Sequence, residues 1–252
     1  MTPHTRQAPL IDVEVTPLAV DELLEEFSRA VHDRSPRMVL GHNLHSVHMV
    51  HTDPAFRSCY EKAEITLVDG MPVLAMLALG ELAAGRKPFG VSRRLGSTDW
   101  ISESVRLDCM ERVAVFGARA ESNRAALEAL RSGAPHTEFL GIPADPWREE
   151  DFPQVTSAIR EFDPQLLLVG MGMPLQERLA SELRRSTGVP VIAAVGGAVD
   201  QISGAQSLAP RWVGRMGFEW LWRLASDPRR LTGRYVVEPV RLAGLLLTRR
   251  TA

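Results

Sequence analysis

Short apolar runs alternate with longer amphipathic segments along this chain, and that alternation constrains its fold more than any other feature. Strands are predicted at Leu10–Val15, Met38–Leu40, Ile65–Val68, Val113–Phe116, Leu166–Val169 and Val189–Val195. Helices are predicted at Val20–Asp33, Pro72–Ala83, Asp99–Asp108, Ser122–Arg131, Pro153–Phe162 and Gln176–Arg185. Strands separated by helices pair in parallel and are covered on both faces. The sequence therefore predicts a doubly wound α/β fold with a mainly parallel sheet.

Length and composition narrow the class of protein. The 252 residues, 45% of them hydrophobic, fit one compact α/β unit or one domain with an appendage. A net charge of −2 creates no global field that attracts nucleic acid, so no nucleic-acid partner is expected. Two cysteines, Cys59 and Cys109, are too few for a disulfide framework and favour a reducing compartment. The first residues lack a signal-peptide pattern, and the longest uncharged apolar run, Val189–Val199, is about half a membrane span. We expect a cytoplasmic protein without a transmembrane helix.

The charge is concentrated near the C-terminus. Between Arg211 and Arg250, nine arginines against three acidic residues give a net charge of +6, so the remainder of the chain carries −8. The same segment holds Trp212, Trp220 and Trp222, three of the five tryptophans. Arginine interleaved with aromatic and aliphatic residues suits an anionic membrane surface or a diphosphate. The alternative is a solvated helical hairpin packed on the core.

Segments rich in glycine follow five of the predicted strands. They are Gly41-His42-Asn43, Asp69-Gly70-Met71-Pro72, Gly117-Ala118-Arg119, the segment from Gly170 to Pro174 and the segment from Gly196 to Asp200. Four of them begin with glycine, which permits close backbone approach to a phosphate. Since ligands of such sheets bind beyond the carboxyl ends of the strands, a nucleotide or another phosphorylated ligand is predicted there. Tight turns are the alternative explanation.

Two side chains at these strand ends suit acid–base chemistry on a sugar. Asp69 follows an apolar strand, and Pro72 opens the next helix. A carboxylate in this place can accept a proton from a hydroxyl nucleophile, with a helix cap as the alternative. Asn43 offers a donor and an acceptor for a sugar hydroxyl, and its alternative is also a turn or a cap.

Two other motifs suggest a nicotinamide site and a metal site, but their details do not support either site. The stretch from Val169 to Glu177 resembles a dinucleotide fingerprint, but Leu175 stands at the third glycine position, which disfavours a nicotinamide site. What remains is Gln176 and Glu177 in the first turn of a helix at the ligand edge. His42, His45, His48 and His51 recur every third residue, and on a helix this step drifts by about 60° each time, so no metal site is predicted.

The chain also lacks a D-x-D motif, the diphosphate-metal signature of many sugar-nucleotide transferases. Charge neutralisation of a leaving diphosphate would then fall to arginines and backbone amides. This gives the basic C-terminal segment a chemical role.

Five blocks resemble the WecG/TagA/CpsF glycosyltransferases, family 26, over roughly residues 35–236. The blocks are Asn43-Leu44-His45, Ala63 to Met71, Val169 to Glu177, Ala194 to Gly204 and Ala209 to Tyr235. The resemblance implies a Rossmann-like catalytic core at residues 1–208 and an appendage at 209–252 that completes the site and contacts membrane. It also implies inverting, metal-independent transfer of a hexose, N-acetylmannosamine or a related sugar, from a UDP-sugar to a polyprenyl-diphosphate-linked acceptor. Such a reaction belongs to cell-surface polysaccharide synthesis and needs no cofactor.

The resemblance also implies roles for individual residues. Asp69 matches the catalytic base, Asn43 the asparagine beside it, and Gln176 a glutamine that contacts the donor. Asp200 falls near the nucleotide, and the glycine loops place Gly172 and Gly197 at the substrate. The motif R-x-x-G-[ST]-D is one residue longer here, so either Arg93 or Arg94 faces the ligand. The basic residues of the appendage are Arg215, Arg223, Arg230 and Arg234.

Two other classes of function stay open at this point. One is a nucleotide-dependent oxidoreductase on the same fold, and the other is a non-catalytic, membrane-associated partner of a polysaccharide assembly complex. The sequence leaves open the donor sugar, the acceptor sugar, the polymer and whether the chain forms a homo-oligomer. We expect the protein to lie peripherally on the inner leaflet of the cytoplasmic membrane.

Overall fold

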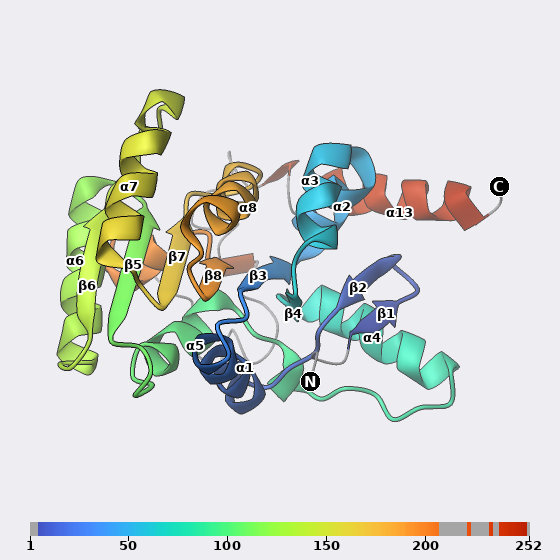
Figure 1. Cartoon of the computed structure of the whole chain (residues 1–252). Coiled ribbons are helices and arrows are strands. Elements are labelled where there is room, and N and C mark those ends of the chain that lie inside the picture. Colours follow the sequence, from blue (N-terminus) through green and yellow to red (C-terminus); the bar gives the residue numbers. More distant parts are fainter. Residues whose placement is uncertain (1–4, 207–220, 223–231, 234–236, 251–252) are drawn as a thin grey trace.

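A computed structural model describes residues 5–206, 221–222, 232–233 and 237–250, and its centre is a six-stranded sheet (Figure 1). The strands are β3 (Arg37–His42), β4 (Ile65–Val68), β5 (Arg112–Gly117), β6 (Glu138–Ile142), β7 (Leu166–Gly170) and β8 (Val191–Ala194). Their order is β4-β3-β8-β7-β5-β6, and every neighbouring pair is parallel. The predicted α/β class and parallel sheet are confirmed.

Helices cover both faces of the sheet. One face carries α2 (Leu44–Thr52), α3 (Pro54–Glu61), α4 (Met71–Ala83), α7 (Phe152–Phe162) and α8 (Leu175–Thr187). The other carries α1 (Val20–His32), α5 (Ser97–Ser104), α6 (Ala120–Gly133) and α9 (Ala198–Ile202). Successive side chains of β7 enter the two cores alternately, Leu167 on one face and Leu166 and Leu168 on the other. Burial on both faces explains why the strand is apolar at every position.

The N-terminal part differs from the prediction. In place of a single strand at Leu10–Val15, the chain forms an antiparallel hairpin of β1 (Arg6–Ala8) and β2 (Val13–Val15). The hairpin leads to Thr16, whose N–H donates to the carbonyl of Thr66 (2.6 Å) and whose hydroxyl accepts from the Thr66 N–H (3.1 Å). The outer edge of β4 is therefore covered rather than exposed to pairing.

Strand β6 and the helices α2, α3 and α9 also escaped the pattern analysis. Strand β6 contains Gly141, and α2 and α3 together hold histidines and polar residues where a clear apolar stripe is expected. The 3₁₀ turns η1 (Val91–Arg93) and η2 (Glu149–Asp151) join helices to their neighbours. Tertiary packing, which local periodicity does not report, decides these elements.

The last described helix, α13 (Glu238–Arg250), packs back onto α2. Leu242 is buried there, and the carboxylate of Glu238 accepts a hydrogen bond from Nδ1 of His45 at 2.6 Å. In the described ranges no helix is long and apolar enough to cross a bilayer. The predicted boundary between residues 208 and 209 lies outside the described residues and stays a prediction.

Strand ends β5 and β7 approach so closely that one glycine is obligatory. Gly117 has φ +120°, and a Cβ built on it would overlap the carbonyl of Gly170. We predict that Gly117→Ala lowers the free energy of unfolding by about 3–5 kcal/mol, the sum of backbone strain and overlap.

Gly188→Ala is the matched control, because Gly188 also has positive φ (+71°) but meets nothing within 4 Å. That variant should cost only about 1 kcal/mol. Urea unfolding of the three proteins measures both values. Equal losses in the two variants would contradict the close-approach argument.

Candidate active site

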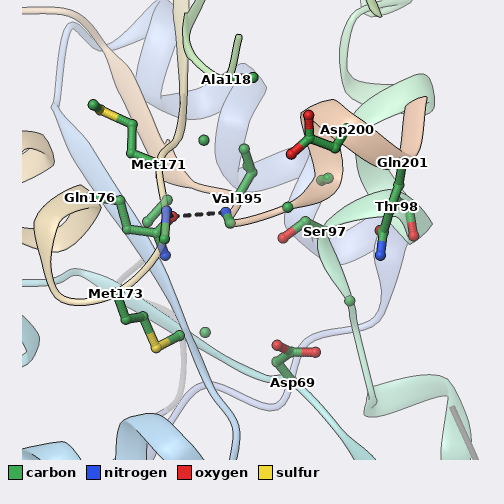
Figure 2. Close-up of a pocket in the computed structure, with 18 of the residues that line it drawn as sticks. Asp69, Ser97, Thr98, Ala118, Met171, Met173, Gln176, Val195, Asp200 and Gln201 are labelled. Carbon is green, nitrogen blue, oxygen red and sulfur yellow. Dashed lines mark hydrogen bonds between the residues drawn. The ribbon is translucent and has the colours of Figure 1, made fainter. Parts of the chain in front are cut away.

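A cavity of ≈ 890 Å³ opens at the carboxyl ends of β3, β4, β5, β7 and β8 (Figure 2). Parallel strands end at one edge, so segments far apart in the sequence meet here. Among the predicted site residues, the structure brings seven to the cavity wall: Asn43, Asp69, Arg94, Gly172, Gln176, Gly197 and Asp200. The predicted convergence of the glycine-rich segments at one edge is confirmed.

The register of β3 and β4 places the two proposed catalytic side chains opposite each other. His42 pairs with Val68, and the N–H of Asp69 donates to the carbonyl of His42 at 2.9 Å. Asn43 is therefore the partner of Asp69 across the ladder. Nδ2 of Asn43 donates to Oδ2 of Asp69 at 3.3 Å. The amide thus orients the carboxylate at the cavity wall.

Asn43 also caps a helix, as its alternative explanation predicted, and its contact with a sugar hydroxyl stays a prediction. Its Oδ1 accepts the N–H of Ser46 at 3.1 Å, and its own N–H donates to the hydroxyl of Ser46 at 2.9 Å. This reciprocal cap begins α2. Because the oxygen is used by the cap, the NH₂ group of the same amide is directed to Asp69.

Asp69 itself is not the cap of the helix that follows. That helix, α4, begins at Met71, and its N-cap is Gly70. Two glycines leave room around the carboxylate, since a Cβ at Gly41 would lie 3.2 Å from Cβ of Asp69 and one at Gly96 would lie 3.7 Å from Oδ1. The side chain accepts the bond from Asn43, lies beside Gly41 and Gly96 and faces the cavity (Figure 2).

A buried aromatic pair supports this corner of the site. The ring of His42 stacks on Tyr60 at a centroid distance of 4.2 Å, and the Tyr60 hydroxyl donates to the carbonyl of Gly41 at 2.9 Å. Nδ1 of His42 lies 3.1 Å from the hydroxyl of Ser46. Burial, with a smaller contribution from His51, lowers the pKa of His42 to about 3. The imidazole is neutral around neutral pH and serves packing rather than proton transfer.

The histidine repeat does not converge on one point. His51 bonds the carbonyl of Ile11 (2.8 Å), His45 pairs with Glu238, and His42 stacks on Tyr60. Among the described residues, no group of three or more His, Cys, Asp or Glu side chains is arranged to hold a metal ion. His42, His45 and His51 therefore have three separate structural roles.

Gln176 ties two glycine loops together. Its buried Oε1 accepts the N–H of Gly172 at 3.2 Å and the N–H of Gly196 at 2.9 Å, and its Nε2 donates to Glu177 at 2.8 Å. Figure 2 shows this side chain between the loop of Met171 and the loop of Val195. The side chain predicted to contact the donor is thus bonded within the protein, where it shapes the loops that face the ligand. Its contact with a donor stays a prediction.

Only one of the two candidate arginines reaches the cavity. Arg93 donates to the carbonyl of Pro17 at 3.0 Å, pairs with Glu22 and does not line the cavity. Arg94 lines it and pairs with Asp99 at 3.1 Å. The position of Arg93 therefore does not support its prediction as a ligand-facing residue, because its guanidinium binds Pro17 and Glu22 away from the cavity wall.

Asp200 lies across the cavity from Gln176, on the same side as Ser97 (Figure 2). The first turn of α5 supplies Ser97 and Thr98, and α9 supplies Asp200 and Gln201. Sequence analysis did not select Ser97, Thr98 or Gln201. The available signal was the motif R-x-x-G-[ST]-D, in which Ser97 and Thr98 follow Gly96.

The described wall of the cavity is acidic. Its ionisable side chains are five carboxylates and two guanidinium groups: Asp69, Asp99, Asp145, Glu177, Asp200, Arg94 and Arg119. Both arginines face carboxylates, Arg94 at Asp99 and Arg119 at Asp145 (3.2 Å). The predicted basic residues Arg215, Arg223, Arg230 and Arg234 lie outside the described residues.

A model of the glycosyl transferase WecG/TagA/CpsF family matches residues 8–252. The chain belongs to this family. An N-acetylglucosaminyldiphosphoundecaprenol N-acetyl-beta-D-mannosaminyltransferase of Bacillus subtilis (strain 168) is 28% identical over 120 residues, which are 48% of this chain and 46% of that relative. A protein of the same name from Staphylococcus aureus (strain MRSA252) is 25% identical over 182 residues, 71% of this chain and 68% of the relative. The glycosyltransferase class predicted from the sequence is confirmed.

The lowered pKa of His42 predicts a pH-dependent stability. Unfolding restores the ordinary pKa of about 6.5, so below that pH the unfolded chain binds a proton that the folded chain refuses until about pH 3. Stability should fall by up to about 1.4 kcal/mol per pH unit on acidification through this window. The variant His42→Phe keeps an aromatic ring on Tyr60. In this variant the part of the stability loss that is due to His42 should be absent between pH 6.5 and 4.

The matched control is exposed His136→Gln, whose stability curve should run parallel to that of the parent chain. Urea unfolding at several pH values provides the curves, and the difference between variants removes the contribution of the carboxylates. Parallel curves for His42→Phe and the parent would refute the buried neutral histidine.

The loop tie of Gln176 is tested by Gln176→Leu. This change leaves two loop amides without their acceptor and should lower stability by about 2 kcal/mol. The amides of Gly172 and Gly196 should exchange with solvent faster than the rest of the sheet edge. Gln165→Leu is the control, because Oε1 of Gln165 also accepts a backbone N–H, that of Arg112 at 2.7 Å. The control should lose stability without changing exchange at the two glycines.

Proposed function

We propose that this chain transfers an N-acetylmannosamine-type hexose from a UDP-sugar to a sugar carried on a polyprenyl diphosphate, with inversion and without a metal ion. One observation carries the proposal: the carboxylate of Asp69, oriented by Asn43, faces a large cavity at the carboxyl edge of the sheet. Family membership supplies the reaction class, and the names of the relatives supply the acceptor and the sugar.

Asp69 is the general base of the proposed reaction. It removes the proton of the acceptor hydroxyl as that oxygen attacks the anomeric carbon from the face opposite UDP, and the bond to the diphosphate breaks in the same step. The bond from Nδ2 of Asn43 orients the carboxylate before substrate arrives, so little reorganisation is needed during reaction. Asn43 is accordingly a positioning residue in this scheme.

The dimensions of the cavity suit a nucleotide sugar. A volume of ≈ 890 Å³ lies within the range of about 300–1,000 Å³ typical of ligand sites. The loops that Gln176 joins present backbone near the place where a phosphate is expected, and Asp200 and Ser97 offer polar groups on the opposite wall. We assign the donor to this part of the cavity and the acceptor hydroxyl to the side of Asp69.

Charge supports a role for the C-terminal segment in the same reaction. The described wall is acidic, whereas a leaving diphosphate develops negative charge. The segment from Arg211 to Arg250 carries +6, and its helix α13 packs on α2, the helix that Asn43 caps. We propose that Arg215, Arg223, Arg230 and Arg234 neutralise the diphosphate and that the segment rests on the inner leaflet.

The two rival functions are less well supported. An oxidoreductase would use the loop of Gly172 for a dinucleotide, but Leu175 and Gln176 occupy the start of that helix, and Gln176 closes the loop on itself. A non-catalytic assembly partner needs no oriented carboxylate at a cavity. Turnover by the purified chain distinguishes it from an enzyme.

Asp69→Asn tests the general base. Such groups typically contribute about 10²–10⁴-fold, so kcat should fall by that factor while UDP binding and stability persist. Asn43→Ser is the companion variant: serine still caps α2 but has no NH₂ group for Asp69. It should lower kcat by about tenfold with nearly unchanged stability.

The assay uses purified full chain, a UDP-sugar panel and a lipid-diphosphate acceptor, with and without EDTA. Near-normal turnover by Asp69→Asn would remove Asp69 from this role. Loss of activity in EDTA that is restored by magnesium or manganese would overturn metal independence.

A further inference from the structure

Helix α4 and the turn after it expose an apolar surface. Leu79 is 52% exposed, Leu82 is 55% exposed, and Val91 of η1 is 54% exposed. On an ordinary surface helix the outward positions are polar, but here the spacing from Ala75 to Leu79 to Leu82 forms an outward apolar stripe. We call Leu79, Leu82 and Val91 the α4 surface.

Cations border the α4 surface. Lys87 is exposed in the loop between α4 and η1, and Arg86 beside it binds Glu81 through two hydrogen bonds of 2.6 and 2.8 Å. The hydrogen bonds from Arg86 lower the pKa of Glu81, and the charge of Arg6 in the hairpin adds to this effect. Glu81 is buried and its charge is balanced by Arg86, which leaves Lys87 and Arg6 as the net positive charges beside the stripe.

The acidic side of the neighbouring hairpin is directed elsewhere. Strand alternation places Arg6 on the same face as buried Ala8, whereas Glu14 lies on the opposite face, across from Gln7. The nearest hairpin carboxylate at the turn, Asp12, accepts a hydrogen bond from Gln7. The apolar stripe is thus bordered by Arg6, Arg86 and Lys87.

The position of α4 links this surface to the cavity. The helix starts at Met71, two residues after Asp69, and runs outward from the edge strand β4 (Figure 1). At 1.5 Å per residue, Leu79 and Leu82 lie about 12–17 Å along the helix axis from its first residue.

We propose that the α4 surface docks on an anionic lipid bilayer, with Leu79, Leu82 and Val91 inserted among the lipids and Arg6, Arg86 and Lys87 at the headgroups. An apolar stripe bordered by cations has the chemistry of an interfacial membrane contact. This contact is separate from the C-terminal segment. That it presents Asp69 to a lipid-linked acceptor rests on the proposed function.

A second copy of the chain is the less favoured occupant. A symmetric contact between two α4 surfaces would bring Lys87 and Arg6 of one copy close to the same cations of the other. Like charges at such a contact oppose association. Anionic headgroups, in contrast, would attract these cations.

The experiment uses the full chain and two kinds of vesicle, one of equal parts phosphatidylglycerol and phosphatidylcholine and one of phosphatidylcholine alone. The test variant is Leu79→Glu with Leu82→Glu. The matched control is Ala129→Glu with Ser132→Glu, which adds the same charge at the same spacing to exposed positions of α6 beside the far edge strand. Both test positions are more than half exposed, so folding should persist, and thermal unfolding checks this.

The partitioning of the test variant to the anionic vesicles should fall at least about tenfold. Two leucines that insert among the lipids are each replaced by a negative charge, which the anionic headgroups repel. The control should change less than about twofold. A second variant, Lys87→Glu, should weaken binding to anionic vesicles and leave binding to neutral vesicles unaltered. Unchanged partitioning of the test variant would overturn the proposal.

Two further measurements separate the alternatives. Sedimentation velocity without vesicles that shows a dimer for the parent and a monomer for the test variant would assign the surface to a second copy and overturn the proposal. In transfer assays, the test variant should have a raised KM for an acceptor in vesicles but normal kinetics with a short-chain, water-soluble acceptor. Absence of transfer by the parent chain with both acceptors would refute the proposed function, while the vesicle binding would still decide the docking surface.

Discussion

The candidate site depends on one pairing, the parallel alignment of β3 with β4. That register sets Asn43 opposite Asp69 and lets the amide of one bind the carboxylate of the other at 3.3 Å. A shift of β4 by one residue against β3 would turn Asp69 to the other face of the sheet, away from Asn43. The hairpin that covers the outer edge of β4 protects this pairing, because it satisfies the backbone of Thr66.

Structural and functional roles coincide in the same side chains. Asn43 caps α2 with its oxygen and orients Asp69 with its nitrogen, and Gln176 joins two loops whose glycines line the cavity. Polar groups that bind one another at a cavity wall hold their geometry with little reorganisation. Alanine substitutions at these positions would mix loss of stability with loss of function, whereas serine at Asn43 separates them.

The molecule also separates its charges. The described cavity wall is acidic, the last forty residues are strongly basic, and cations border the apolar stripe of α4. Under the proposed function, this distribution places the cationic segments at an anionic surface. The carboxylates then face the cavity, where the acceptor hydroxyl loses its proton. Both membrane contacts that we propose follow from that separation and are independent of each other.

The sequence by itself determined the fold class, several elements and seven of the residues that line the cavity. Its apolar runs predicted Ile65–Val68 at the observed bounds, because a strand buried on both faces is apolar at every position. Glycine and polar residues after the strands predicted the convergence of Asn43, Asp69 and Gln176 at one edge, since parallel topology makes strand ends meet. The tertiary structure alone decided which of Arg93 and Arg94 faces the cavity, that Gln176 binds two loops, and that Asn43 is both cap and partner of Asp69. These outcomes depend on side-chain direction and on contacts between residues far apart in the chain, and local periodicity carries neither.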